Sequence, residues 1–538
     1  MKKDGKKRVW FLLIFCTAVF AAFLVRLYWM QFTMADHYAK KLEQASQTSY
    51  TVRIPAARGS IVDRSGTALV QDDTVYDLAL CVPAPPDTEM AQTLQTLKEL
   101  DLGGKDVETQ LAAFCSAVSA GELPLAENLT QAQCQSLLAA GLPQSGAVRL
   151  TARGTRTAVD GTLAPQLLGG VGAMSAEQWA QKKAQGLAMD ESIGQWGLEA
   201  AWEDALRGRA GSLKVTVDRS SGGRTETIQS TPQAGDTLHL YLDADLQRTL
   251  RSALQQQIET LQATKPEGKG KEACAGAAVV VDVQTGGVLA AVSLPDYDLA
   301  SWRQNYAALA TAQGAPLVNR VLNGQYAPGS AFKPAVAASA LAAGIITPQS
   351  TVNCGGRYTY YAGYQPRCLQ LGHRGAVSMV TALRHSCNIY FYDVGPLQLA
   401  AYAGALARDG QRPALHFAQS TTDTAGNITW QAQPDVLAQA PGGAAVFAPI
   451  REGMAQMAQT LRTLRESPIP LACKTGSPQL AGTLPDGTHY TNSVLIGYGP
   501  VQQPRFAVAV VIEYGGGGSN AAPVLRAAAD WFAAAGMA

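Results

Sequence analysis

A serine and a lysine lie three positions apart in the stretch 326–334, which reads Tyr-Ala-Pro-Gly-Ser-Ala-Phe-Lys-Pro. The Pro-Gly pair predicts a turn, and the Ala/Leu-rich run 331–343 predicts a helix that begins just after Ser330. Residues i and i+3 share one face of a helix, so the Ser330 hydroxyl and the Lys333 amine can meet. A lysine that is desolvated or crowded by other cations can accept the serine proton, which would make Ser330 a nucleophile.

One serine–lysine pair is a weak signal, because any Ala-rich helix can carry it by chance. Two further motifs follow downstream, Ser386-Cys387-Asn388 and Lys474-Thr475-Gly476. Ser-x-x-Lys, Ser-x-Asn and Lys-Thr-Gly together are typical of penicillin-binding proteins and class A β-lactamases. Three motifs in this order are far more specific than one, and they predict a serine acyl-transfer site.

The elements that must position these motifs are predicted from residue 236 onward. Asp243 or Asp245 can cap a helix that runs through Gln257, and the turn 285–287 joins two strands in a hairpin. The predicted strands are 238–242, 275–283, 288–294, 470–476, 491–497 and 506–514, and a closing helix is predicted at 521–535. This pattern predicts helices packed against an antiparallel sheet.

Length and charge limit the remaining possibilities. With 538 residues the chain is too long for one ordinary domain, so two or three folded units are expected. The formal net charge of +1 leaves no large positive excess to neutralise phosphates, which argues against a nucleic-acid-binding protein. The overall composition is ordinary, so contact with a membrane must be argued from a local stretch.

The N-terminus supplies such a stretch. Lysine and arginine residues in 1–8 precede an apolar segment at 9–30, where Arg26 lies close enough to the end to reach the membrane surface. A cleaved signal peptide is the alternative, but its apolar region would be shorter and no convincing cleavage site is evident. The pattern predicts an uncleaved transmembrane anchor, with a cytoplasmic tail at 1–8 and the later residues outside the cytoplasm.

Residues 31–235 separate the anchor from the motif-bearing part of the chain. The turn-rich, charged stretch 58–66 is interpreted as a hairpin with a solvated ion pair. Residues 94–142 are rich in Ala, Gln and Leu and predict helices and loops. Gly-rich joints surround a predicted helix at 198–206, which indicates packing and turns rather than chemistry.

The chain as a whole resembles the class B penicillin-binding proteins, and looks most like their elongation-type branch, penicillin-binding protein 2. The resemblance implies a pedestal, or dimerisation-like, α+β domain at 31–235. It also implies a penicillin-binding transpeptidase domain at 236–538 with a serine β-lactamase-like fold. The stretches that carry it are Arg58-Gly59, Asp63-Arg64, Gly197-Leu198-Glu199, Asp243 with Leu246-Gln247, Pro295-Asp296-Tyr297-Asp298, His373-Arg374-Gly375, 386–392 and 497–523.

The resemblance implies a peptidoglycan D,D-transpeptidase that β-lactams inhibit covalently and that needs no cofactor for catalysis. Ser330 would attack the carbonyl between the last two D-alanines of a stem peptide, and Lys333 would take its proton. Ser386 would relay a proton to the leaving amine, while Asn388 would hold Lys333 and the substrate amide. An amine of a second strand would then resolve the ester and form a crosslink.

The third motif would bind the substrate. Lys474 and Thr475 would receive the substrate carboxylate on an edge strand, and Gly476 would let the substrate backbone approach closely. The backbone N–H groups of Ser330 and Ser477 would form an oxyanion hole. The resemblance also implies docking on a membrane-embedded glycan polymerase of the SEDS type.

Two departures from the family leave alternatives open. Ser477-Pro478-Gln479 replaces the usual Thr-Ala-Gln, which keeps a hydroxyl. After Gly395, a segment that flanks the cleft in the family looks missing, and a predicted helix at 396–400 follows at once. A D,D-carboxypeptidase and a catalytically impaired scaffold therefore remain alternatives. A β-lactamase is disfavoured, because no glutamate for a deacylating water can be recognised.

Nine cysteines are an odd number for a fully paired extracellular protein, and most are expected to be buried free thiols. Cys354, Cys368, His373 and Cys387 form one group whose three thiols and one imidazole could hold a structural zinc ion. Some elongation-type relatives have a metal site in that region. A disulfide between Cys354 and Cys368, or unconnected thiols, are the alternatives.

Overall fold

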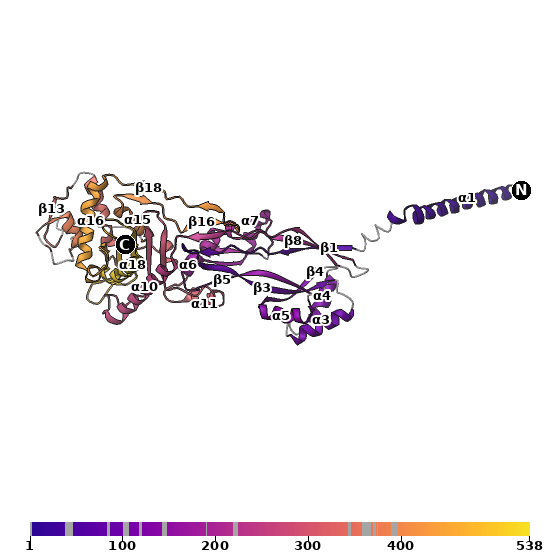
Figure 1. The fold of residues 1–538 in the computed structure, drawn as a ribbon, viewed down its shortest axis with the longest axis horizontal. Helices are drawn as coiled ribbons and strands as arrows, with labels where there is room; N and C mark the ends of the chain where they lie inside the picture. Colours follow the sequence, from indigo (N-terminus) through magenta and orange to yellow (C-terminus); the bar gives the residue numbers. More distant parts are fainter. Residues whose placement is uncertain are drawn as a thin grey trace. The chain divides into compact units, whose positions relative to one another are not determined.

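The computed structural model shows two compact units, each built from several stretches of the chain (Figure 1). The first comprises Met1–Ala57, Asp73–Thr155 and Arg209–Gln233, and the second comprises Arg58–Asp72, Arg156–Gly208 and Ala234–Ala538. The boundary predicted at residue 235 stays a prediction. The structure describes residues 3–37, 47–82, 87–100, 107–117, 121–142, 148–189, 191–218, 224–342, 346–357, 367–368, 373, 375–388 and 396–537.

The first unit begins with a long apolar helix. Helix α1 (Lys3–Tyr28) continues into the π-helical turn η1 (Trp29–Thr33). The 24 residues Trp10–Thr33 are long and apolar enough to cross a membrane, and none of the most apolar stretch is buried. The Arg26 guanidinium lies 5.3 Å from the Trp29 ring centroid, which suits a residue at a membrane surface. The helix coincides with the predicted anchor.

The rest of the first unit contains two groups of antiparallel strands. Strands β1 (Gln47–Ile54), β8 (Gly211–Asp218) and β9 (Arg224–Ser230) form a three-stranded sheet. Strand β4 (Gly121–Leu129) pairs with residues 76–82 of β3 (Ala68–Val82). The remaining elements are α3 (Asp87–Glu99), α4 (Val107–Ala117), α5 (Gln131–Ala139) and β5 (Val148–Ala158). The helices predicted within 94–142 are present, but the prediction missed β4.

A five-stranded antiparallel sheet forms the core of the second unit, in the order β12-β11-β23-β22-β19. Almost every residue of these strands is buried, because helices cover both faces of the sheet. The strands are β11 (Gly276–Asp282), β12 (Val288–Leu294), β19 (Ala472–Gly476), β22 (Ser493–Gly499) and β23 (Phe506–Ile512). They confirm the predicted strands, with small displacements of their ends.

Helices α10 (Ala244–Thr264) and α18 (Ala522–Ala534) cover one face of this sheet. Asp243 caps α10, because its carboxylate accepts hydrogen bonds from the backbone N–H groups of Asp245 and Leu246 at 3.1 Å. Apolar residues recur every three or four positions along α10 and face the sheet. They are Leu246, Leu250, Leu254, Ile258 and Leu261.

Four helices lie on the opposite face of the sheet, and two of them adjoin the first and second motifs. They are α13 (Lys333–Ala342), α14 (Met379–Arg384), α15 (Pro396–Ala407) and α16 (Gly443–Thr460). Helix α15 packs against β11 and β23, whereas α16 packs against β19, α13 and α14. The same hydrophobic cluster contains Ala337 of α13, Ile450 of α16 and Ile496 of β22. The sequence motifs therefore lie beside a continuous apolar core.

A second sheet in this unit contains β10 (Thr237–Leu240), which pairs with β2 (Ile61–Val62) and β16 (Ala418–Thr422). Strand β17 (Ile428–Gln431) completes its edge.

The second unit also contains shorter elements. They are α6 (Pro165–Leu168), β6 (Gly170–Ala173), α7 (Ala176–Lys182), η3 (Lys183–Gln185), β7 (Ser192–Trp196), α8 (Gly197–Ala201), α9 (Glu203–Leu206), α11 (Trp302–Thr311), α12 (Arg320–Asn323), β13 (Thr351–Cys354), β14 (Gly375–Ser378), β15 (Gln411–Pro413), β18 (Val436–Gln439), α17 (Arg462–Arg465), β20 (Gln479–Thr483), β21 (His489–Thr491) and η6 (Gly518–Ala521). The single helix predicted at 198–206 is thus two short helices.

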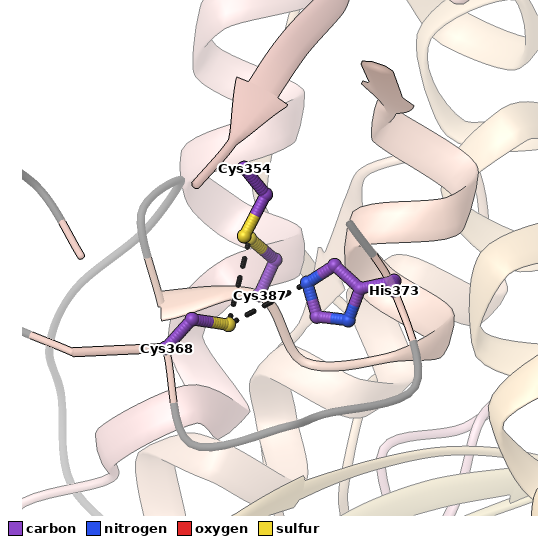
Figure 2. A group of neighbouring side chains, drawn as sticks. All are labelled: Cys354, Cys368, His373 and Cys387. Carbon is purple, nitrogen blue, oxygen red and sulfur yellow. Dashed lines mark hydrogen bonds between the residues drawn. The ribbon is translucent and has the colours of Figure 1, made fainter. Parts of the chain in front are cut away.

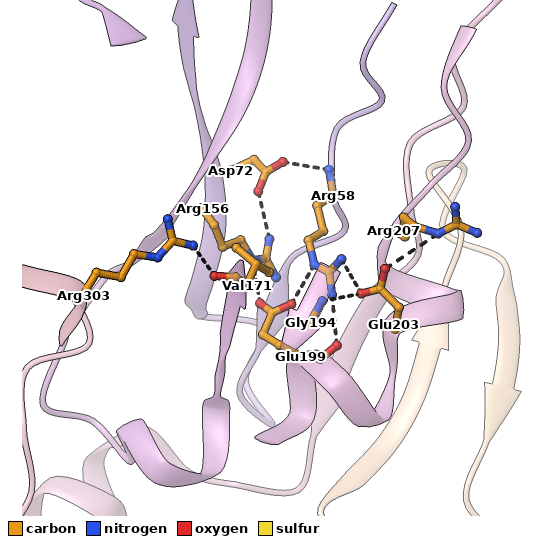
Figure 3. Close-up of polar contacts among 9 residues, drawn as sticks. All are labelled: Arg58, Asp72, Arg156, Val171, Gly194, Glu199, Glu203, Arg207 and Arg303. Carbon is orange, nitrogen blue, oxygen red and sulfur yellow. Dashed lines mark hydrogen bonds and ion pairs between the residues drawn. The ribbon is translucent and has the colours of Figure 1, made fainter. Parts of the chain in front are cut away.

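Buried charged groups join distant segments of the second unit (Figure 3). Arg58 pairs through Nε with Glu199 Oε2 at 2.6 Å and through Nη1 with Glu203 Oε2 at 2.8 Å. Arg156 pairs through Nε with Glu199 Oε1 at 2.6 Å and through Nη1 with Asp72 Oδ1 at 3.1 Å. Each oxygen of the fully buried Glu199 carboxylate therefore faces a guanidinium group.

The hairpin predicted at 58–66 is present, because β2 pairs antiparallel with the start of β3, but the prediction of a solvated ion pair is wrong. Arg58 pairs with a buried carboxylate 141 positions away in the sequence. Asp63 instead stabilises its own turn, where it accepts hydrogen bonds from the backbone N–H groups of Ser65 at 2.8 Å and Thr67 at 2.9 Å. Local sequence could not reveal a partner so far along the chain.

Candidate active site

Ser330 lies in the 3₁₀ turn η4 (Gly329–Phe332), which leads directly into helix α13. The first turn of the predicted helix is therefore 3₁₀, in which residues i and i+3 lie above one another. The turn packs against strand β19. Among the described residues, no hydrogen bond is formed by the Ser330 hydroxyl, so proton transfer from Ser330 to Lys333 stays a prediction.

The Lys333 amine is buried and faces the second motif. Its Nζ donates hydrogen bonds to the Ser386 carbonyl oxygen at 2.7 Å, to Asn388 Oδ1 at 2.8 Å and to Ser386 Oγ at 3.3 Å. The side chain is almost completely inaccessible to solvent. Burial disfavours the ammonium form and lowers the pKa of Lys333 to about 8. A fraction of these amines is thus neutral near pH 7 and able to accept a proton.

Ser386 and Asn388 follow the end of helix α14. Ser386 has a φ of 50°, which is unusual for a residue other than glycine and aims its side chain at the two lysines. The Asn388 amide is fixed on both sides, because its Nδ2 donates to the Arg367 carbonyl oxygen at 3.2 Å. The first and second motifs are therefore joined by hydrogen bonds, as the sequence predicts.

Lys474 of the third motif also contacts Ser386. Its Nζ donates to Ser386 Oγ at 2.9 Å and to the Thr475 carbonyl oxygen at 2.9 Å. The residue lies on β19, which is an edge strand as predicted, but its side chain is fully buried. Burial, and then the positive charge of Lys333, holds the pKa of Lys474 well below its usual range.

Gly476 allows the third motif to pack directly on η4 (Gly329–Phe332), the serine turn. A Cβ atom at this position would lie 2.2 Å from the Pro328 carbonyl oxygen and 3.1 Å from the Ala331 nitrogen. Any larger residue would therefore push strand β19 away from η4. Thr475 is largely buried, and Ser477 is exposed with its Oγ accepting a hydrogen bond from the Gly518 N–H at 2.8 Å.

The predicted metal ligands lie together beside the second motif (Figure 2). The ligand atoms of Cys354, Cys368, His373 and Cys387 all lie within 4.8 Å of one another, and all four residues are buried. Cys368 Sγ is 3.9 Å from Cys387 Sγ and 3.5 Å from His373 Nε2. Within the described part of the chain, no disulfide joins Cys354 and Cys368, so the structure does not show that alternative.

Two expectations about the surroundings of the site have different outcomes. Residues 389–395, where a segment looks missing, lie outside the described residues, so that prediction is not tested. The helix predicted directly after them is α15, which begins at Pro396.

The sequence did not single out Arg320 and Glu513, which form an ion pair near the serine turn. The one available signal was a carboxylate placed at the end of the apolar run 506–512.

Two family models match the chain. The penicillin-binding protein dimerisation domain matches residues 53–240. The penicillin-binding protein transpeptidase domain matches residues 276–395 and 392–530, a range that contains all three motifs. The two transpeptidase stretches meet at the position where the sequence predicts a missing segment.

Individual relatives agree with these models. Peptidoglycan D,D-transpeptidase MrdA of Escherichia coli strain K12 is 25% identical over 610 residues, which cover 96% of this chain and 92% of the relative. A protein in the structure "Structural coordination of polymerization and crosslinking by a peptidoglycan synthase complex" is 25% identical, with a TM-score of 0.70 over 97% of both chains. Penicillin-binding protein 2 of Helicobacter pylori, solved with MreC, shares the fold, with 20% identity and a TM-score of 0.72 over 91% of this chain and 100% of that one.

The dimerisation and transpeptidase domains occur in the order that the resemblance implies, and the N-terminal helix is suited to anchoring them in a membrane. Transpeptidases of this family need no cofactor for catalysis. Because the two family models cover most of the sequence and the Escherichia coli relative matches 96% of it, the chain belongs to the class B penicillin-binding proteins of the penicillin-binding protein 2 type and is a peptidoglycan D,D-transpeptidase.

Proposed function

We propose that Ser330, Lys333, Ser386, Asn388 and Lys474 carry out D,D-transpeptidation of peptidoglycan stem peptides through an acyl-enzyme on Ser330. One observation supports this assignment above all. A continuous set of hydrogen bonds joins the Asn388 amide, the two lysine amines and the Ser386 hydroxyl, directly beside the helix that follows the serine turn. Neither buried lysine has a carboxylate hydrogen-bonded to it among the described residues, so both are suited to exchanging protons.

In acylation, Ser330 Oγ bonds to the carbonyl carbon between the terminal D-alanines and the peptide C–N bond breaks. The neutral amine of Lys333 takes the hydroxyl proton. Ser386 Oγ already accepts hydrogen bonds from both lysines, so its own proton can point to the leaving amine. Ser386 gives that proton to D-alanine and regains one from a lysine, which leaves the proton count unchanged.

In deacylation, the amine of a second stem peptide bonds to the ester carbonyl carbon and the bond to Ser330 Oγ breaks. The attacking amine loses a proton through the same lysine and serine groups, and Ser330 recovers its hydroxyl proton. The product is a peptide crosslink, and the enzyme returns to its starting state. Water in place of the amine would give the D,D-carboxypeptidase reaction, which is the alternative outcome.

Lys474 and Thr475 would bind the substrate carboxylate. In the free enzyme, burial favours the neutral form of Lys474, but a bound carboxylate would raise its pKa again and restore the charge. The backbone N–H groups of Ser330 and Ser477 would stabilise the developing oxyanion. Gly476 supports both roles, because the absence of a side chain lets strand β19 pack in direct contact with the serine turn.

The test uses full-length protein in mild detergent and glycan strands that carry pentapeptide stems. Transpeptidation should give crosslinked stem dimers and free D-alanine in equal amounts, because each crosslink releases one D-alanine. D-alanine without dimers would show that the chain is a carboxypeptidase. Dimers formed by Ser330→Ala would contradict the proposed nucleophile.

We also propose that the N-terminal helix holds the catalytic unit on the outer side of a bacterial cell membrane and docks on a SEDS-type glycan polymerase. The basic residues before the helix favour a cytoplasmic N-terminus. The similar protein from a peptidoglycan synthase complex supports such a partner. Replacing residues 9–30 by an unrelated apolar span should impair wall synthesis in cells and loosen co-purification with the polymerase, whereas unchanged results would indicate simple tethering.

We further propose that Cys354, Cys368, His373 and Cys387 hold a structural zinc ion. Three thiolates and one imidazole are a common tetrahedral donor set, with Zn–S bonds of about 2.3 Å and therefore sulfur atoms about 3.8 Å apart. The observed separation of 3.9 Å between two of the sulfur atoms fits this arrangement. The burial of all four residues also suits a closed, structural site.

The position of Cys387 indicates which segment such an ion would stabilise. Its two neighbours, Ser386 and Asn388, both accept hydrogen bonds from Lys333. An ion that fixes the Cys387 thiolate would therefore fix the segment that holds the catalytic amine. Its contribution would be structural, and none of the proton transfers requires it.

A further inference from the structure

A carboxylate outside the three motifs joins Tyr326, just before the serine turn, to the end of strand β23. Glu513 directly follows β23, and its Oε1 accepts a hydrogen bond from the Tyr326 hydroxyl at 2.6 Å. The same oxygen pairs with the Nε of Arg320 at 2.9 Å. Tyr326 lies just before the Pro-Gly turn that presents Ser330. A hydrogen bond from a hydroxyl to an ionised carboxylate is stronger than one between neutral groups.

Arg320 makes this carboxylate an immobile acceptor. Its guanidinium also donates to the carbonyl oxygens of Gly314 at 2.5 Å and Ala315 at 3.2 Å. Its backbone N–H donates to Ser293 Oγ at 3.0 Å, which ties it to strand β12. The Arg320 side chain is only 7% exposed, so solvent does not compete for these contacts. Glu513 is therefore held in place by a residue that cannot itself move far.

The segment that begins at Glu513 reaches the other side of the active site. Five residues further on, the Gly518 N–H donates to Ser477 Oγ at 2.8 Å. A Cβ atom on Gly518 would lie 2.4 Å from the Gly476 carbonyl oxygen, so segment and strand are in close contact. Between these points, the Gly516 N–H donates to the Thr491 carbonyl oxygen at 3.0 Å. One short segment thus contacts Tyr326, just before the serine turn, at one end and Ser477, directly after the third motif, at the other.

We propose that Glu513 is a positioning residue for acylation, which acts through Tyr326 to set the place of Ser330 relative to Ser477. This inference rests on the proposed role of Ser330 as the nucleophile. The two N–H groups that would form the oxyanion hole belong to Ser330 and Ser477, so their spacing determines how well the developing charge is stabilised. Displacement of a reacting group by about 1 Å can cost on the order of 100-fold in rate.

The experiment separates positioning from simple stabilisation. Full-length Tyr326→Phe, Glu513→Gln and the double variant are acylated with benzylpenicillin, and three quantities are measured. They are the fraction of chains that can be labelled, the dissociation constant of the non-covalent complex, and the first-order acylation constant of the labelled chains. Tyr498→Phe is the matched control, because its buried hydroxyl has no hydrogen-bond partner in the described part of the chain.

Positioning through this link predicts similar falls in the acylation constant for Tyr326→Phe and Glu513→Gln, on the order of 10- to 100-fold, with the dissociation constant nearly unchanged. The double variant should be no slower than Glu513→Gln, because both changes remove the same link. Tyr498→Phe should match the unmodified protein.

Two results would overturn the inference. One is an unchanged acylation constant with a smaller labelled fraction, which would mean that the link only stabilises the fold. The other is fully additive losses in the double variant. Failure of the proposed function is distinguishable, because the unmodified protein would then not be labelled at Ser330 at all.

Discussion

Lys333 and Asn388 meet at 2.8 Å, where the buried amine donates to the side-chain amide oxygen. The amide is held from its other side by the Arg367 carbonyl oxygen, so it can fix the amine rather than follow it. This contact links the proposed base, Lys333, to the second motif. An asparagine suits this position, since its amide accepts from Lys333 and donates to Arg367 at the same time.

Removal of this amide should slow acylation. Asn388→Ala deletes one of the acceptors that orient the Lys333 amine, so the acylation constant with benzylpenicillin should fall about tenfold or more. Asn427→Ala is a matched control, because in the described part of the chain its side-chain amide bonds only to Asp423, in an exposed turn. Equal acylation constants for the two variants, measured by stopped-flow fluorescence, would contradict the role of Asn388.

The pH dependence of acylation should follow Lys333. Only the neutral amine can accept the serine proton, and burial lowers the pKa of this lysine to about 8. The second-order acylation constant should therefore rise about tenfold per pH unit below that value and level off above it. An ordinary lysine would give a rise that continues to about pH 10. A constant that falls as the pH rises from about 6 to 8 would contradict the assignment of Lys333 as the base.

The buried ion network should be essential to the stability of the second unit. Glu199→Gln leaves two buried guanidinium groups without their shared carboxylate, so the free energy of unfolding should fall by about 3–5 kcal/mol. Glu466→Gln is the control, because its ion pair with Arg462 is exposed and should contribute less than about 1 kcal/mol. Urea unfolding followed by tryptophan fluorescence measures both. A small effect of Glu199→Gln would contradict its central place in the network.

The proposed metal site predicts about one zinc ion per chain in protein purified without chelator. Cys354→Ala should lose the ion, whereas Cys134→Ala removes a buried free thiol outside the cluster and should keep it. Elemental analysis, combined with a count of thiols in the denatured protein, gives the answer. Absence of metal with two thiols lost to oxidation would show that a disulfide forms instead.

The three motifs could be predicted from the sequence because each is short and contains its own chemistry. Their local settings were also readable, since the apolar periodicity of α10 and of the five strands depends only on neighbouring residues. The gathering of Cys354, Cys368, His373 and Cys387 followed from residue type, although nothing in their spacing gave their distance from Lys333. Features that depend on neighbouring residues, such as short motifs and the periodicity of a helix or strand, can therefore be predicted from the sequence.

The contacts that the sequence did not reveal join residues far apart in the chain. Tyr326 and Glu513 are separated by 187 positions, and Arg58 and Glu199 by 141. Each of these charged or hydroxyl groups looks like an ordinary surface residue until its partner is known. The full burial of Lys474 was also unexpected, because a lysine on an edge strand normally faces solvent.

The most direct test of the account is the site of acylation. Full-length protein is treated with benzylpenicillin, digested with trypsin and analysed by mass spectrometry, and the adduct should lie on Ser330 within the peptide 321–357, because trypsin does not cleave between Lys333 and Pro334. Ser330→Ala should carry no adduct at any position. An adduct that persists in Ser330→Ala would contradict the assignment of Ser330 as the nucleophile. So would fragment ions that place the adduct on another residue.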